Sequence, residues 1–135
     1  MAVGCAPSGD SYVLPSLAAA TVVEDEGFRA VNLGPHTPLE TLATGVSAFK
    51  ASLVWICFTS VDRARRGVRR EILKLAARFS RVGAVLVVGG RQVDRLTPSH
   101  EKGVSVGHPM AELRAVARGL VLSGNAARGA EGSRA

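Results

Sequence analysis

The stretch LVWICF, residues 53–58, decides the fold class because every residue in it is apolar. A strand with one face in water alternates polar and apolar residues, whereas a continuous apolar run of this length is typical of a strand buried on both faces. Such strands occur in parallel sheets that helices cover on both sides. The stretch therefore predicts an α/β domain with this strand at the centre of its sheet.

Outward from this stretch, short apolar runs alternate with segments of helical periodicity, and glycine or proline marks most of the switches. The predicted strands are residues 1–6, 30–33, 53–58, 84–88 and 104–106, and the predicted helices are 15–26, 38–49, 64–79 and 109–121. Because connections between parallel strands are right-handed, this alternation predicts a flavodoxin-like, doubly wound, five-stranded parallel sheet of order 2-1-3-4-5 with helices on both faces.

The start of the second helix carries a capping pattern, TPLE, at residues 37–40. Thr37 is the expected N-cap, Pro38 the first helical residue, and Glu40 the residue that closes a capping box. At the other end of the chain, SGNAARGAEGSRA is small and polar. We therefore expect one domain over residues 1–122 and a flexible tail over 123–135.

Composition limits the compartment and the class of protein. No apolar run approaches the ~20 residues of a membrane helix, and the first residues lack the charged leader and long apolar core of a signal peptide. A cytoplasmic protein is expected. In that compartment Cys5 and Cys57 are expected to be reduced and buried.

The net charge of +6 is concentrated in the third predicted helix. The basic segment that includes this helix places four cations in a stripe that we predict to face a partner: Arg63, Arg66, Arg70 and Lys74. A solvated helix face explains the same pattern. Because no aromatic residues interleave with the cations, nucleic acid is not an expected partner of this domain alone.

Ligands of doubly wound sheets bind outside the carboxyl ends of the strands, where the strand order reverses. The loops after the first, third and fourth strands, residues 8–14, 57–62 and 89–93, therefore define the predicted site. The first loop has neither a G-x-G-x-x-G nor a Walker pattern, and the third strand ends in Cys-Phe-Thr, without the aspartate of a phosphoacceptor receiver domain. No Ser-His-Asp arrangement is suggested by His36, His100 and His108, which are scattered over loops.

Four segments resemble the cobalamin-binding domain family: GDSY (9–12), FRAVNLGPHTPLETL (28–42), LVWICFT (53–59) and VLVVGGRQV (85–93). The likeness runs from Val3 to about Val121. In length and in the closing GHPMAELRAVARGLV (107–121), the chain is similar to the small subunits of methylaspartate (glutamate) mutases. Its second strand and following turn are also similar to cobalamin-sensing domains of transcriptional regulators.

The resemblance implies a D-x-H-x-x-G loop, in which the histidine binds cobalt and the aspartate orients its ring. In this chain Asp10 matches the aspartate, Tyr12 stands at the histidine position, and Pro15 stands at the glycine position. The family's S-x-L element and glycine pair line the channel for the nucleotide tail, and the matching positions hold Cys57, Thr59, Gly89 and Gly90. The match is therefore full in fold and incomplete in the site, which lacks the histidine, the loop glycine and the serine of the family's pattern.

Each matched residue also has a purely structural interpretation. Asp10 is suited to capping the first helix or organising its turn. Tyr12 is suited to filling the vacated ligand pocket, and the glycine pair permits a tight turn at the end of a strand. Trp55 is expected to be core packing.

Two hypotheses follow. The first is a cobalamin-binding module like the small, cofactor-positioning subunit of an adenosylcobalamin-dependent carbon-skeleton mutase, an isomerase whose large barrel subunit is a separate chain. The chain would then be at most a non-catalytic subunit, and its binding of cobalamin would be base-on, weak or altered. The second is a regulatory or protein-interaction domain, alone or as a homo-oligomer, that kept the fold and lost or changed the tetrapyrrole.

Overall fold

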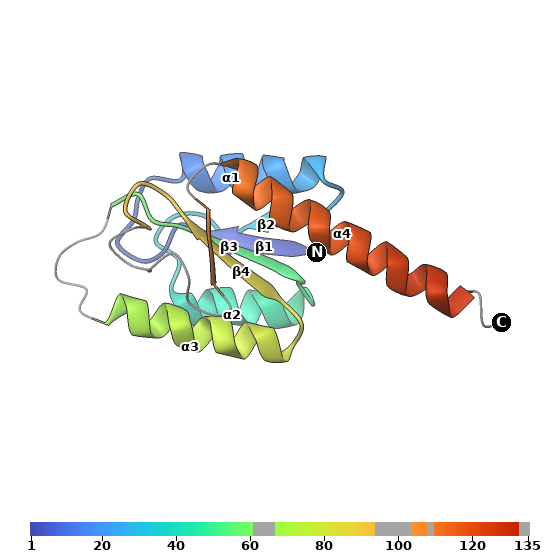
Figure 1. Cartoon of the computed structure of the whole chain (residues 1–135). Coiled ribbons are helices and arrows are strands. Elements are labelled where there is room, and N and C mark those ends of the chain that lie inside the picture. Colours follow the sequence, from blue (N-terminus) through green and yellow to red (C-terminus); the bar gives the residue numbers. More distant parts are fainter. Residues whose placement is uncertain (61–66, 94–103, 108–109, 133–135) are drawn as a thin grey trace.

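The computed structural model of the chain is a parallel sheet covered by helices on both faces (Figure 1), and it describes residues 1–60, 67–93, 104–107 and 110–132. The strands are β1 (Ala2–Cys5), β2 (Ala30–Asn32), β3 (Leu53–Cys57), β4 (Val85–Gly89) and β5 (Val104–Gly107). The helices are α1 (Leu14–Asp25), α2 (Leu39–Ala48), α3 (Val68–Arg81) and α4 (Met110–Gly132). The predicted α/β class and parallel sheet are confirmed.

The order of the sheet places β3 between β1 and β4. It runs β2-β1-β3-β4, and β5 pairs with the outer edge of β4; all pairings are parallel. Every residue of β3 is buried, as its apolar run predicts. The reversal of strand order between β1 and β3 creates the switch point at which ligands bind in such sheets.

Alternate residues of β3 pack into separate cores on the two faces of the sheet. Val54 and Ile56 belong to the core under α2 and α3. Trp55 and Cys57 belong to the core under α1 and α4. Figure 1 shows this division, with α1 and α4 on one side of the sheet and α2 and α3 on the other.

The third predicted helix, 64–79, corresponds to α3, which buries one face. The buried residues are Val68, Ile72, Leu75, Ala76 and Phe79. The predicted start of this helix, residues 64–66, lies outside the described residues. The buried residues recur at helical spacing, so the cations of α3 lie on its outer side.

Ion pairs join the end of α1 to α4. Arg118 donates two hydrogen bonds of 3.0 Å to the carboxylate of Glu26, and Arg114 lies 3.2 Å from Asp25. The bond from Arg118 lowers the pKa of the Glu26 carboxyl. The two helices on this face are thereby held side by side.

None of the described helices has the length and apolar content needed to cross a bilayer.

The capping box predicted for α2 is wrong. The helix begins at Leu39 with Pro38 as its N-cap and no side-chain cap bond. The hydroxyl of Thr37 instead donates backwards to the carbonyl of Gly34 at 3.1 Å. Its amide donates to Ala6 at 3.0 Å. The hydroxyl of Thr37 therefore turns back into the preceding loop, and the amide that a capping box would direct to Glu40 is committed to Ala6, just after β1.

Helix α4 continues past residue 123, where the predicted tail starts, as far as Gly132. The hydroxyl of Ser123 bonds the carbonyl of Gly119 at 2.9 Å, one helical turn earlier. In Figure 1, α4 extends well past the end of the sheet.

Gly90 allows the turn after β4 to approach the end of β3. Its φ is +105°, and a Cβ on it would overlap the main chain of Phe58, lying 2.7 Å from the amide nitrogen. The amide of Phe58 donates to Gly89 at 2.8 Å, and the amide of Gln92 donates back to Phe58 at 3.1 Å. Any side chain at position 90 therefore separates these two loops.

We predict that Gly90→Ala lowers the free energy of unfolding by more than ~2 kcal/mol, since left-handed strain and backbone overlap add. Gly27→Ala is the matched control: Gly27 has φ +94°, but a Cβ there meets no atom within 4 Å. It should cost only about 1 kcal/mol. Urea unfolding followed by circular dichroism measures both, and equal losses would contradict the close approach.

Candidate functional site

The buried carboxylate of Asp10 ties together the loops that follow β1 and β3. Asp10 is 1% exposed. One of its oxygens accepts the amide of Tyr12 at 3.0 Å. The other accepts the amides of Thr59 and of Ser60, the latter at 3.0 Å. Three backbone donors thus hold the carboxylate, which organises its own turn and does not cap α1, whose N-cap is Val13.

The main chain of Asp10 connects the same loop to the one after β2. The amide of His36 donates to the carbonyl of Asp10 at 3.1 Å, and Pro7 forms a parallel bridge with Thr37. His36 has a φ of +52° and an exposed side chain. The sequence analysis assigned His36 only to a loop. Its position in a Gly-Pro-His-Thr-Pro turn directly after a strand is the signal that places it at the ligand edge.

Replacing the carboxylate tests this role. We expect Asp10→Ala to lower the free energy of unfolding by about 2–3 kcal/mol, because it leaves buried backbone donors without their acceptor. Asp25→Ala, which removes only the exposed ion pair with Arg114, should leave stability nearly unchanged. Thermal unfolding measures the stability of both variants. An Asp10→Ala protein as stable as Asp25→Ala would contradict the role of Asp10 in holding the loops together.

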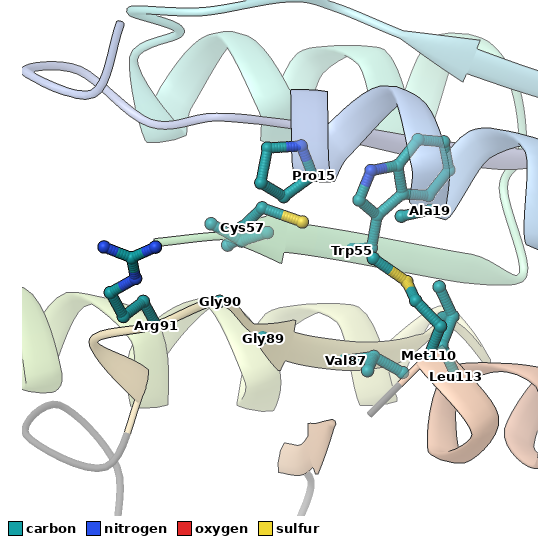
Figure 2. A pocket seen from close by; sticks show the side chains of 11 residues that line it. Pro15, Ala19, Trp55, Cys57, Val87, Gly89, Gly90, Arg91, Met110 and Leu113 are labelled. Carbon is teal, nitrogen blue, oxygen red and sulfur yellow. The ribbon is translucent and has the colours of Figure 1, made fainter. Parts of the chain in front are cut away.

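A pocket of about 260 Å³ opens between the sheet and the α1–α4 layer at the carboxyl ends of β3 and β4 (Figure 2). Helices α1 and α4 each contribute residues from their first two turns. The lining residues are Pro15, Ala19, Trp55, Ile56, Cys57, Val87, Gly89, Gly90, Arg91, Met110 and Leu113. Arg91 is the one charged residue among them, and the rest of the lining is largely apolar.

The indole of Trp55 borders this pocket and is fixed from two sides. Its Nε1–H donates to the hydroxyl of Ser16 at 3.0 Å, and that hydroxyl donates to Asn32 at 3.1 Å. A Cβ at Gly4 would overlap the indole ring, so the glycine on β1 provides the space that the ring occupies. Trp55 is core packing, as predicted, and it is also a wall of the pocket.

The predicted cofactor residues fall into two groups. Cys57, Gly89 and Gly90 line the pocket together, and Cys57 pairs with Gly89 in the sheet. Thr59 lies beside Asp10, and its hydroxyl oxygen is buried without a hydrogen-bond partner among the described residues. Tyr12 is 51% exposed and does not line the pocket. The interpretation that Tyr12 fills a vacated pocket is therefore wrong.

The described part of the basic stripe lies away from this site. Arg70 and Lys74 are exposed on α3, which covers the opposite face of the sheet from the pocket. Arg63 and Arg66 lie outside the described residues. On the same helix Arg78 lies 3.3 Å from Glu40 of α2. Arg70 and Lys74 therefore do not contribute to the pocket.

Both cysteines are free and buried, as predicted. They lie on opposite faces of the sheet, Cys5 in the core under α2 and α3 and Cys57 in the core under α1 and α4. Burial raises the pKa of each thiol from 9.0 to about 12, and the nearby charge of Asp10 contributes to the shift of Cys57. Both side chains are therefore protonated in the folded protein at neutral pH.

These pKa values predict a loss of stability in alkali. Unfolded thiols ionise above 9.0 while the folded ones stay protonated to about 12, so the folded state binds more protons in this window. The stabilising contribution is complete below about pH 9 and disappears as pH rises towards 12. A Cys5→Ala, Cys57→Ala double variant should show a shallower decline in urea-unfolding free energy over this range; an identical decline would contradict the shifts.

The site does not fit a metal that its first loop ligates through histidine. Tyr12 stands at the position of the ligand, and Asp10, the expected orienting group, already accepts three amide bonds. Within residues 1–60, 67–93 and 110–125, no group of three or more histidine, cysteine, aspartate or glutamate side chains is placed to hold a metal ion. The pocket and the edge of the sheet are the features of this site that could hold a ligand.

Comparison with known proteins agrees with this fold. No family model matches the chain, and no curated protein matches it by sequence. A solved structure of a novel cobalamin-binding protein from Desulfitobacterium hafniense DCB-2 superimposes with a TM-score of 0.65 at 18% identity, over 85% of this chain and 56% of that one. The monomethylamine corrinoid protein of Methanosarcina barkeri gives a TM-score of 0.63 at 17% identity, over 88% and 57%.

The chain thus spans less than two thirds of the length of either neighbour. At such identities the likeness concerns the fold. This chain has the parallel α/β fold that these two corrinoid-binding proteins share, with helices on both faces of its sheet.

Proposed function

We propose that this chain is a corrinoid-binding domain that holds cobalamin against the carboxyl edge of its sheet without supplying a ligand to the cobalt. The observation that carries the proposal is the open pocket beside Gly89 and Gly90 at the carboxyl ends of β3 and β4, next to the switch point between β1 and β3. Doubly wound sheets bind their ligands at this point, and two proteins that share the fold are corrinoid-binding proteins.

The size of the pocket determines how such a cofactor is held. A volume of about 260 Å³ falls below the range of roughly 300–1,000 Å³ for drug-sized ligands, and a corrin macrocycle is larger than those. The macrocycle therefore rests outside the pocket, near the loops of Tyr12 and Thr59. Because neither Tyr12 nor Asp10 offers an imidazole, cobalamin keeps its own base on the metal.

In this proposal the chain positions the cofactor and performs no substrate chemistry. Bound cobalamin supplies the reactivity of its cobalt centre, and the protein supplies binding and orientation. We propose adenosylcobalamin as the form bound and a separate barrel subunit as the partner, in the manner of the small subunits of carbon-skeleton mutases. The chain's similarity in length and closing helix to those subunits supports this assignment.

A second function, a regulatory or protein-interaction domain without tetrapyrrole, is favoured by a different observation. Three large apolar side chains near the start of α1 are exposed: Tyr12 (51%), Leu14 (60%) and Leu17 (46%). Exposed apolar side chains that gather on one surface indicate contact with another protein. In this alternative Asp10 serves only to hold the loops.

Visible spectroscopy tests the corrinoid proposal. The purified protein is mixed with adenosylcobalamin or hydroxocobalamin, desalted, and its spectrum recorded. We expect retained corrinoid with the spectrum of the base-on form, unchanged in Tyr12→Phe and His36→Ala, because neither side chain binds the metal. A Tyr12→His, Pro15→Gly variant should shift the spectrum to that of histidine-ligated, base-off cobalamin.

Other outcomes discriminate clearly. A colourless protein after desalting overturns corrinoid binding and favours the interaction domain. A spectrum that changes in Tyr12→Phe or His36→Ala identifies that residue as a ligand and overturns the base-on assignment. Gly27→Ala, remote from the edge, serves as the control for handling and folding.

A further inference from the structure

We propose that the pocket is a binding site for a small aromatic anion, such as an aryl carboxylate of one or two fused rings. Trp55 limits the depth of the site, and Arg91 recognises the charge at its mouth. This inference goes beyond the proposed function, because it concerns a free ligand and holds whether or not the edge of the sheet binds a corrinoid.

The lining favours a flat apolar group. Pro15 and Ala19 of α1 face Val87 and Gly89 of β4 across the pocket (Figure 2). The indole of Trp55 stands at one end. Pockets of this kind take ligands whose apolar area is buried against such side chains, with few polar groups to fix orientation. Aromatic rings gain further from an indole neighbour.

The charge of the lining favours an anion. Arg91 is exposed, and among the described residues that line the pocket it is the one that carries a charge. Helices α1 and α4 both begin at the pocket, through Pro15 and Met110, and the amino end of a helix carries partial positive charge. Asp10, at the same edge of the sheet, does not line the pocket, and its carboxylate accepts three amide hydrogen bonds.

Trp55 sets the depth because of its register in the sheet. Trp55 pairs with Val87, and Cys57 pairs with Gly89, so the indole lies two residues, or about 6–7 Å of strand, further in than the pair at the mouth. The Ser16 hydrogen bond and the space at Gly4 hold the ring there. A ligand therefore extends from Arg91 to the indole and no further. The volume of about 260 Å³ agrees with this limit.

The chain contains one tryptophan, Trp55. A ligand that reaches the inner end of the pocket should therefore change the tryptophan fluorescence. We would titrate the protein with 2-naphthoate and with the neutral 2-naphthamide by calorimetry and follow Trp55 fluorescence in parallel. Naphthoate is expected to bind and change the fluorescence. The amide, which lacks the charge, should bind at least ~10-fold more weakly, as expected for loss of a charge-assisted bond.

Two variants test the role of the cation. Arg91→Gln should reduce naphthoate affinity about 10-fold, to that of the amide. Arg81→Gln is the matched control, since it removes the same charge from α3 on the opposite face of the sheet and should leave both affinities unchanged. Both positions are exposed, so both variants are expected to fold.

A longer probe tests the depth. Biphenyl-4-carboxylate should bind the native protein at least ~10-fold more weakly than naphthoate and should gain affinity in Trp55→Ala. Ser16→Ala, which only releases the indole, replaces that variant if Trp55→Ala does not fold.

The proposal is overturned if naphthoate does not bind, if naphthoate and the amide bind equally, or if biphenyl-4-carboxylate binds the native protein as tightly as naphthoate. None of these measurements uses a corrinoid, so failure here leaves the proposed function untouched, and the reverse holds too.

Discussion

The carboxylate of Asp10 is the group on which the ligand edge of this domain depends. It is almost completely buried, and it receives backbone donors from its own turn and from the loop after β3. Its carbonyl receives the amide of His36 from the loop after β2. A buried carboxylate is costly unless donors surround it, so the three loops are stable together in this arrangement. The pocket lies beside these loops, at the same edge of the sheet.

Trp55 imposes a second constraint on the same edge. Three residues far apart in the sequence hold the indole in place. Gly4 on β1 leaves the space for the ring, Ser16 on the first turn of α1 accepts its N–H, and Asn32 on β2 accepts the hydroxyl of Ser16. Because each contact serves the others, the ring is a fixed wall and not a side chain free to swing aside. The indole also joins the sheet to α1 and so connects the core to the site.

Residues that act through local pattern were predictable from the sequence, and residues that act through long-range bonds were not. The apolar run of β3 and the helical spacing within α3 identify buried faces directly. The cap at Thr37 failed because its hydroxyl and amide serve the preceding loop and β1. Likewise, the sequence places Asp10 at the ligand edge, but nothing in it indicates that amides nearly fifty residues away occupy the carboxylate.

The two constraints bear on what this edge binds. A metal ligand from the first loop would need an orienting acceptor, yet Asp10 already holds the loops in place. A long appendage entering beside Gly89 would meet the indole of Trp55, whose position three strands and α1 maintain. The base-on assignment and the short pocket are therefore consequences of the same packing, since both follow from groups that stabilise the fold first. A single exchange at Tyr12 moves neither the carboxylate bonds nor the indole, so it changes neither property on its own.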